Sequence, residues 1–536
     1  MTRIKIGFYS VSSVANSSMG TMTAGNESQN QLENLEDLYE LSPMQQGMLF
    51  HSIYSPDSGT YFEQSLFTIK GELNFDAFEG AWRRVLQRHS ILRTAFLWEE
   101  LEKPLQAVYR RVELPLETDD WRFLSVEERE RRLQSFIDND RSQGFELSSA
   151  PLIRLALFRF SDDEYKFLFS RHHLVLDRWS RALLLKDVYA SYHALSEGRE
   201  PSLEAARPYV DYIAWLKNQD ANAAERFWRN SLADFTEPTS LGIERADKGE
   251  DRYGDRRIRL SEEATAKLSD FARQHRLTLN TLVQGVWALL LSRYSGEDDV
   301  LFGVTVAGRP AELAGAESIV GLFINTLPLR VRVPPASSVR SWLATLQAQQ
   351  SELQQFEYSS LVDIQGWSDV PRGVPLFESI LVFENLPVGS NYQAAGGNVE
   401  FRDDRGIGST TGYPLTVLVS PARQLAIQIV YDVGRYTSEA IDTVLTNLQT
   451  LFENLPAGAE TSVSRLPLLT APERELVSVW RVGDAERTAA GAGALGQIGQ
   501  RTTRDVVAAL LPPVAVGAEV RRAPAEEGRD AGHGRR

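Results

Sequence analysis

The feature that most constrains this chain is a pair of adjacent histidines, His172 and His173, followed by Asp177. The apolar run before the pair, residues 165–170, predicts a strand, and the apolar spacing of residues 179–195 predicts a helix. The histidines are therefore expected where a strand passes into a helix, on a connection that a rigid scaffold holds in place. Because the chain has only 7 histidines, two together at such a connection indicate a place suited to proton transfer near neutral pH.

The spacing His-His-x-x-x-Asp is by itself compatible with three kinds of site. It can be a polar cluster that packs a turn, a set of metal ligands, or a general base with its support. A metal site is disfavoured because adjacent residues of an extended chain point to opposite sides, and no further His or Cys cluster completes a ligand shell. If the site is a general base, one histidine faces a cleft, its neighbour packs inward, and Asp177 fixes the turn and the orientation of the ring.

Composition excludes several classes of protein. The chain has 536 residues, of which 43% are hydrophobic and 24% charged, as is typical of a globular protein of two or three domains. Cysteine is absent, which excludes disulfides and thiol nucleophiles and fits a reducing, cytoplasmic location. The net charge of −15 argues against nucleic-acid binding. We expect neither a membrane span nor a signal peptide, because no apolar run is long enough.

Composition also divides the chain into segments. Residues 1–34, rich in Ser, Asn, Gly and Thr, are expected to form a flexible leader. A loop with Pro, Gly and charges begins near residue 236 and marks the boundary between an N-terminal lobe, 35–235, and a C-terminal lobe, 236–470. Residues 471–536 are dominated by Ala, Gly, Arg, Val and Glu, and we expect a linker followed by a disordered tail.

Hydrophobic periodicity predicts the helices and strands of the two lobes. Further strands are expected at residues 150–160, 256–260, 300–306, 327–333, 376–384, 414–420 and 424–431. Further helices are expected at residues 74–93, 211–235, 261–275, 279–294 and 438–451. Strands and helices mix without a strict βαβ rhythm, which favours two similar α/β sandwich lobes.

Short blocks along the chain resemble, in order, those of the condensation domains of nonribosomal peptide synthetases. They are residues 41–51 (LSPMQQGMLFH), 88–96 (RHSILRTAF), 172–177, 211–215, 227–228, 308–310 (GRP), 321–330 (GLFINTLPLR) and 468–474. The resemblance covers about residues 35–480. It implies an α/β fold of two lobes similar to chloramphenicol acetyltransferase, arranged as a V-shaped pseudo-dimer.

The resemblance also implies an activity, that of an amide-forming acyltransferase in secondary metabolite biosynthesis. A donor carrier protein and an acceptor carrier protein would approach from opposite sides of a channel between the lobes. Phosphopantetheine arms on these peptidyl carriers would bring an acyl or peptidyl thioester and an aminoacyl thioester to a central histidine. No cofactor would be bound directly. The chain contains neither a carrier block nor an adenylation domain, so we expect partner proteins, or an adjacent adenylation domain in a parent synthetase.

Carried over by position, the resemblance assigns roles to the residues around the histidine pair. His173 is the central histidine, which would place the acceptor amine and take its proton once the tetrahedral intermediate has formed. His172 would pack, and Asp177 would orient the loop through a salt bridge to Arg309. The remaining candidates, which would line the channel, are Arg178, Trp179, Ser180 and Asn325. No metal ligands are assigned.

Arg178 departs from the family pattern, which usually has Gly directly after the Asp. The arginine can point to solvent, line the donor channel, or contact a phosphopantetheine phosphate. We expect the first of these, because a long charged side chain on a helix is most often solvated.

Three other functions are compatible with the residues. An epimerisation domain shares the fold and the histidine pair, although the blocks at 308–310 and 468–474 favour condensation. A non-catalytic module that recruits carriers is disfavoured by an intact His173, and an acyltransferase using free coenzyme A is a further alternative. Within condensation domains, the opening block at 42–51 resembles the subclass that takes a D-configured donor.

Overall fold

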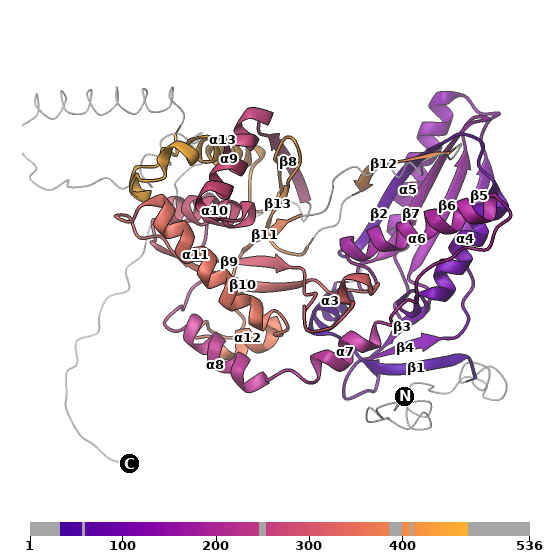
Figure 1. Ribbon diagram of the computed structural model, residues 1–536, viewed down its shortest axis with the longest axis horizontal. Helices are drawn as coiled ribbons and strands as arrows, with labels where there is room; N and C mark the ends of the chain where they lie inside the picture. The colour runs from indigo at the N-terminus through magenta and orange to yellow at the C-terminus, as the bar shows by residue number, and fades with distance from the viewer. Residues whose placement is uncertain (1–32, 56–58, 246–252, 385–398, 408–410, 470–536) are drawn as a thin grey trace, which may run out of the picture.

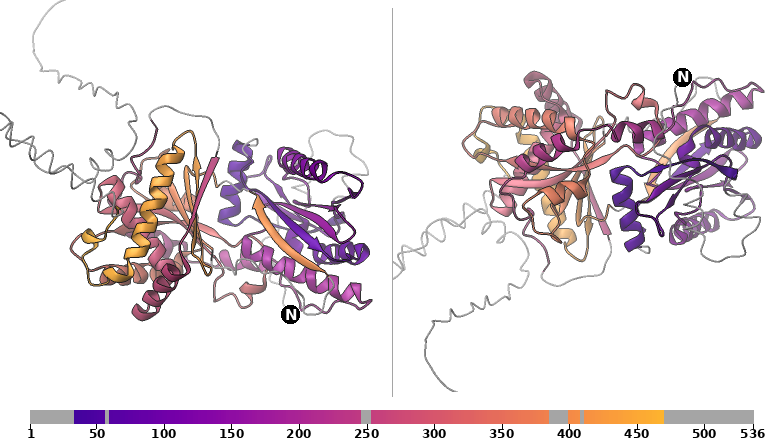
Figure 2. Two further views of the ribbon diagram at one scale, coloured as in Figure 1. Left: turned by 90° about the horizontal axis from the view of Figure 1, so that it is seen from above. Right: turned by 90° about the horizontal axis from the view of Figure 1, so that it is seen from below.

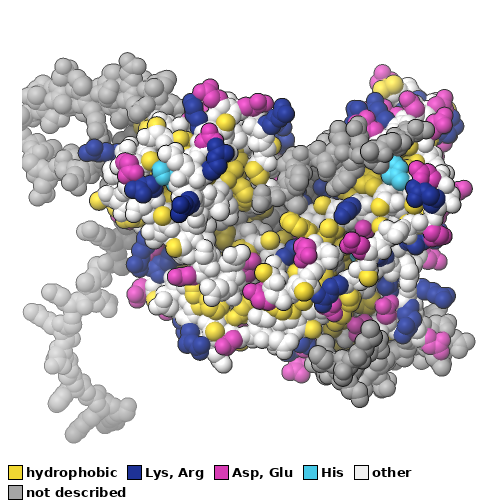
Figure 3. Space-filling view, viewed as in Figure 1, with side chains coloured by type: hydrophobic (Ala, Val, Ile, Leu, Met, Phe, Trp, Pro, Cys, Tyr) yellow, Lys and Arg dark blue, Asp and Glu magenta, His cyan; other side chains and the backbone are white. Residues whose placement is uncertain are grey.

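The computed structural model describes residues 33–55, 59–245, 253–384, 399–407 and 411–469. The expected leader, apart from residues 33 and 34, and the expected linker and tail lie outside these residues. The described chain forms two lobes that lie side by side (Figure 1). The space-filling surface is hollowed between the lobes at its upper edge (Figure 3). Among the described residues, no helix combines the length and hydropathy that crossing a membrane requires.

The N-terminal lobe is built on a five-stranded sheet with the order β12-β2-β7-β6-β5. Its strands are β2 (Phe62–Lys70), β5 (Leu116–Asp120), β6 (Ile153–Arg159), β7 (Glu164–His172) and β12 (Glu400–Ile407). Alternation along β7 sends Phe167 and Phe169 into one core and Leu168 into another. The first core is shared with α4 (Phe75–Arg88) and α6 (Arg178–Ser196), the second with α5 (Val126–Gln143). Helices therefore cover both faces of this sheet.

A smaller sheet and two further helices extend the N-terminal lobe toward its neighbour. The sheet has the order β1-β4-β3, with β1 (Leu35–Glu40), β3 (Thr94–Leu97) and β4 (Leu105–Tyr109). Helix α3 (Pro43–Tyr54) begins with a capping box in which Ser42 and Gln45 satisfy each other's backbone. Because α3 contacts β10 and α12 of the other lobe, this helix lies where the lobes meet (Figure 1). Helix α7 (Val210–Leu216) leads the chain toward the second lobe.

The C-terminal lobe is built on a six-stranded sheet with the order β10-β9-β11-β13-β14-β8. Its strands are β8 (Tyr253–Arg259), β9 (Asp299–Val306), β10 (Asn325–Arg332), β11 (Ser379–Phe383), β13 (Leu415–Ser420) and β14 (Ala426–Asp432). Its longer helices are α8 (Ala221–Ser231), α9 (Glu262–His275), α10 (Leu279–Ser295), α11 (Val339–Leu353) and α13 (Ser438–Asn454), with the short α12 (Leu361–Trp367) beside α8. Figure 2 shows α9, α10 and α13 on the side of the sheet away from the N-terminal lobe.

The lobes do not divide at the expected boundary between residues 235 and 236. Helix α8 packs Trp228 and Leu232 into the core of the C-terminal lobe, so the division falls between α7 and α8. Strand β12 then returns to the N-terminal lobe, where Phe401 pairs with Ile69 of β2 and is buried in that core. The expected helix 211–235 is two helices because Asp220 caps a new one, accepting the backbone N–H of Ala223.

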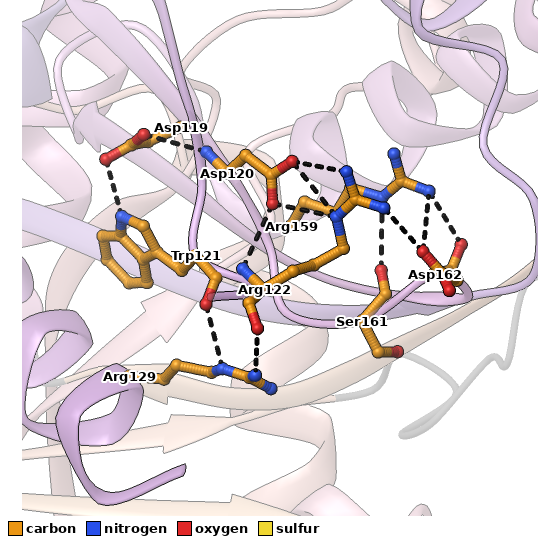
Figure 4. A network of polar contacts seen from close by, with 8 residues as sticks. All are labelled: Asp119, Asp120, Trp121, Arg122, Arg129, Arg159, Ser161 and Asp162. Atoms are coloured by element: carbon orange, nitrogen blue, oxygen red, sulfur yellow. Dashed lines mark hydrogen bonds and ion pairs between the residues drawn. The ribbon is translucent and has the colours of Figure 1, made fainter. Parts of the chain in front are cut away.

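A polar network closes the outer edge of the N-terminal sheet (Figure 4). Arg122, after β5, donates to Asp120 and to Asp162, which lies in the β6–β7 turn. Hydrogen bonds from Arg122 lower the pKa of Asp120 to about 2. Arg129 of α5 donates to the carbonyls of Trp121 and Arg122. The network joins the start of α5 to the turn, but its exposed ion pairs contribute little to stability.

The close approach of Gly321 to Tyr209 gives a test of the contact between the halves of the chain. A Cβ at Gly321 would lie 2.1 Å from Cδ2 of the buried Tyr209. We expect Gly321→Ala to lower the free energy of unfolding by about 1–3 kcal/mol, as overpacking does. The control is Gly47→Ala in α3, where a Cβ meets nothing within 4 Å, and which should be neutral or slightly stabilising. Urea unfolding measures both, and equal stability of the two variants would contradict the packing.

Candidate active site

The connection between β7 and α6 is held rigidly at both ends. β7 ends at His172 and α6 begins at Arg178. Between them, the side chains of residues 174–176 are wholly buried in the core of the N-terminal lobe. The backbone N–H of His173 donates to the carbonyl of Tyr61 at 2.8 Å, which continues the pairing of β2 with β7 beyond the strand end. A histidine on this connection therefore has little freedom to move.

His172 is buried and uncharged. Its Nδ1 accepts the backbone N–H of Leu174 at 3.2 Å, and its Nε2 lies 3.5 Å from the hydroxyl of Ser52. Burial lowers the pKa of His172 to about 3, and the neighbouring His173 acts in the same direction against the opposing charge of Glu63. The structure thus places His172 among packing contacts, on the opposite face of the strand from His173.

His173 is oriented by its own turn. Its Nδ1 lies 2.9 Å from the carbonyl oxygen of Leu176. Because a carbonyl only accepts, Nδ1 must carry a proton, and the neutral ring then presents the lone pair of Nε2. The side chain is 15% exposed, so the ring keeps some surface outside the core. A histidine in this tautomer can accept a proton from a bound group.

A carboxylate that the sequence did not single out lies beside His173. Glu63 of β2 is the register partner of Arg171 of β7, and the side chains of paired residues share one face of a sheet. Oε2 of Glu63 lies 2.5 Å from Nη2 of Arg171, and Oε1 lies 3.7 Å from Nε2 of His173. Burial alone would raise the pKa of Glu63, but the nearby cations, Arg171 foremost, outweigh it and lower that pKa to about 2.

Asp177 holds the connection to the C-terminal half of the chain. It caps α6 by accepting the backbone N–H of Ser180 at 2.6 Å, and its other oxygen accepts that of Phe323 at 2.9 Å. Its carboxylate is 1% exposed and lies 3.5 Å from the guanidinium of Arg309. All of these partners belong to the protein, so Asp177 acts on the shape of the site.

Arg309 forms its hydrogen bonds at the same contact, between the first turn of α6 and the C-terminal half of the chain. It donates to the carbonyls of Ala316 and Ile319 and to the hydroxyl of Ser180. Its guanidinium lies 4.1 Å from the centre of the Phe323 ring, a cation–π contact. The arginine therefore folds the segment 309–323 against the first turn of α6.

Three of the four channel candidates bond to main-chain groups. The hydroxyl of Ser180 donates to the carbonyl of Gly321, and the indole N–H of Trp179 donates to that of Glu317. The amide of Asn325 donates to the carbonyls of residues 357 and 359 and accepts the N–H of Thr326. Each of these side chains therefore holds a main-chain segment in place. Trp179 is partly exposed and also has surface that a ligand can contact.

Arg178, the fourth candidate, reaches across to the C-terminal lobe while keeping nearly half of its side chain in solvent. It forms an ion pair with Glu384, the residue after β11, and the two side chains are 45% and 11% exposed. Glu384 also accepts a hydrogen bond from the hydroxyl of Ser420. The expected solvated arginine thus keeps its exposure, but its charge is paired, because a largely buried carboxylate of the other lobe lies within its reach.

The described residues contain no group of three or more His, Cys, Asp or Glu side chains arranged to hold a metal ion. The titratable groups that the structure brings together at this site are His173 and Glu63. Nε2 of His173 can take a proton, and the ionised Glu63 can stabilise a positive charge beside it.

A sequence model of one family, the condensation domain, matches residues 35–477. Among curated proteins, a component of the linear gramicidin synthase of Brevibacillus parabrevis is 45% identical over 453 residues, covering 84% of this chain and 6% of that protein. Another component of the same synthase is 44% identical over 456 residues, covering 83% of this chain and 9% of that protein. The chain thus spans less than a tenth of the length of these relatives.

Solved structures confirm the expected α/β fold of two lobes. The first condensation domain of the calcium-dependent antibiotic synthetase, in complex with a substrate analogue, matches with a TM-score of 0.67 at 22% identity, covering 81% of this chain and 100% of that one. The X-domain from teicoplanin biosynthesis, in complex with OxyB, matches with a TM-score of 0.67 at 21% identity, covering 81% and 97%. At these identities the likeness concerns the fold, and the activity must be argued from the site.

Removing the carboxylate of Asp177 should destabilise the whole protein. We expect Asp177→Ala to lower the free energy of unfolding by about 3–5 kcal/mol, because the buried charge of Arg309 loses its partner. The control is Asp220→Ala, which removes an exposed N-cap and should cost about 0.5–2 kcal/mol. Thermal or urea unfolding compares the two, and an Asp177→Ala protein as stable as the control would contradict the assignment.

The ion pair between Arg178 and Glu384 should couple the lobes weakly and in a salt-dependent way. In a double-mutant cycle with alanine we expect a coupling of about 1 kcal/mol at low salt that falls as salt is added, since Arg178 is partly exposed. The pair Arg84–Glu200, within the N-terminal lobe and with Glu200 well exposed, should couple less. A cycle with no coupling at low salt would show that the contact contributes nothing.

Proposed function

The chain belongs to the condensation domain family, and we propose that it forms an amide bond between two substrates carried by other protein domains. The donor is an acyl or peptidyl thioester and the acceptor is an aminoacyl thioester, each on the phosphopantetheine arm of a carrier protein. The observation that carries this proposal is the orientation of His173, whose Nδ1 faces the carbonyl of Leu176 and leaves Nε2 available.

The reaction needs a proton acceptor late and not early. A free α-amino group has a pKa of about 7.7–8.0, so a sizeable fraction of the acceptor is neutral near pH 7–8. The amine attacks the thioester carbonyl, and the tetrahedral intermediate carries a positive nitrogen. Nε2 of His173 takes a proton from that nitrogen, the C–S bond breaks, and the proton passes to the departing thiolate. A general base in this position contributes about 10²–10⁴-fold to the rate.

The surrounding residues support this step without touching the reacting atoms. Asp177 and Arg309 hold the connection that carries His173 against the C-terminal half of the chain. His172 stays neutral, so it adds no competing charge beside the ring of His173. Holding the base and both substrates in one geometry supplies a further part of the rate enhancement.

The partners follow from the substrates. We propose that donor and acceptor peptidyl carrier proteins bind this chain, and that an adenylation domain is its neighbour in a longer synthetase. This proposal is supported by the large share of its curated relatives that lies outside the matched region, and by their description as parts of a synthase. Most of the linker-like block at 468–474 falls outside the described residues.

Replacing the central histidine tests the function directly. With both carriers loaded, His173→Ala should form amide about 10²–10⁴-fold more slowly than the unaltered chain. His275→Ala, at the end of α9 in the C-terminal lobe, is the control and should leave the rate unchanged. Mass spectrometry of the acceptor carrier measures the product. A near-normal rate for His173→Ala would overturn the role of the histidine. If the unaltered chain instead gives epimerised donor and no amide, it is an epimerisation domain.

The same assay tests the proposed donor subclass. The donor carrier is loaded with the D- or the L-configured residue, and the acceptor is kept constant. Faster amide formation from the D-configured donor supports the subclass suggested by residues 42–51, and faster formation from the L-configured donor excludes it. Supplying the donor as a coenzyme A thioester shows whether a carrier is needed at all.

A further inference from the structure

Two acceptors of hydrogen bonds face each other at the centre of the site. Oε1 of Glu63 lies 3.7 Å from Nε2 of His173, which is longer than a hydrogen bond. An ionised carboxylate only accepts, and Nε2 of the neutral ring also accepts because its Nδ1 carries the proton. When the ring is neutral, as a proton acceptor must be, the two lone pairs repel each other, and a donor with hydrogens for both relieves this repulsion.

The charge on Glu63 is secured by its surroundings. The cationic or titratable groups that face it are Arg171, Arg181 and His173. Arg171 engages Oε2 at 2.5 Å, and both Arg171 and Arg181 also donate to the hydroxyl of Ser65. Arg171 therefore holds Oε2, and Oε1 is the oxygen that lies toward the ring. Because Glu63 stays ionised at neutral pH, it can hold a positive charge but is too weak a base to take the proton itself.

We propose that Glu63 and His173 together form the binding site for the acceptor's amino group. Oε1 of Glu63 and Nε2 of His173 would each accept one N–H from that group. A nitrogen placed about 2.9 Å from each atom satisfies both acceptors. The inference rests on the proposed amide-forming function and deepens it. Glu63 attracts the acceptor as an ammonium ion, stabilises the positive nitrogen of the tetrahedral intermediate, and then faces the imidazolium that forms when His173 takes the proton.

This binding site favours acceptors with an amino group over acceptors with a hydroxyl group. An amine offers at least two hydrogens and can carry a positive charge, so it can bond to both acceptors at once. A hydroxyl group offers one hydrogen and stays neutral, so it can satisfy either His173 or Glu63 but not both. Without the charge of Glu63, the amine should lose most of its advantage, whereas a hydroxyl acceptor should be affected little.

The test compares two acceptors of the same shape on one preparation of protein. The acceptor carrier is loaded with an alanyl or a lactyl group, which differ only in the amino and hydroxyl substituents, and the rates of amide and ester formation are measured. We expect Glu63→Gln to lower the ratio of the two values of kcat/KM by about 10- to 100-fold, the usual contribution of a charge-assisted hydrogen bond. Most of this decrease in the ratio should come from a higher KM for the alanyl carrier.

The ratio is independent of the fraction of folded protein, since both rates come from one preparation. The double variant Glu63→Gln with Arg171→Gln also removes the cation that pairs with Oε2 of Glu63, and it should show the same drop in the ratio. An unchanged ratio in both variants, with amide still formed, would overturn the role of Glu63. Absence of amide from the unaltered chain would instead overturn the proposed function.

Discussion

The buried carboxylate of Asp177 is the contact on which the arrangement of this protein depends. It ends the connection after β7, caps α6, and accepts the backbone N–H of Phe323 from the other half of the chain. The three residues that follow it also bond to the C-terminal half, through Glu384, Glu317 and Gly321. One turn of helix thus fixes both the position of His173 and the packing of residues 319–323 in the core of the N-terminal lobe. A buried charge of this kind is tolerated because its oxygens are satisfied.

The contacts that this first turn of α6 makes differ in strength. Asp177 and Arg309 are almost wholly buried, so losing either partner leaves an uncompensated charge. Arg178 is partly exposed, and its ion pair with Glu384 is screened by water and salt. The firm contacts therefore hold residues 319–323 in the core of the N-terminal lobe, and the weaker ion pair with Glu384 reaches the C-terminal lobe.

Much of the fold could be predicted from local patterns in the sequence. Most of the features that could not be predicted depend on contacts between residues far apart in the chain. The strand and helix on either side of His173 were predicted because their apolar periodicity is continuous, and α9, α10 and α13 were predicted for the same reason. The return of β12 to the N-terminal lobe was not, since its short polar pattern does not reveal which sheet it joins. Glu63 could not be identified because only the register of β2 with β7 brings it to the ring. Arg178 was noticed, but its partner Glu384 is 206 residues away.

The central claim is that Nε2 of His173 takes the proton in amide formation while Nδ1 only holds the ring. The most direct test is the single-turnover rate of amide formation between two loaded carriers by a His173→Asn variant. Asparagine can keep a donor to the carbonyl of Leu176, so it preserves the turn, but it removes the base. The account predicts a rate about 10²–10⁴-fold below that of the unaltered chain. A rate within a few-fold of the unaltered chain would contradict it.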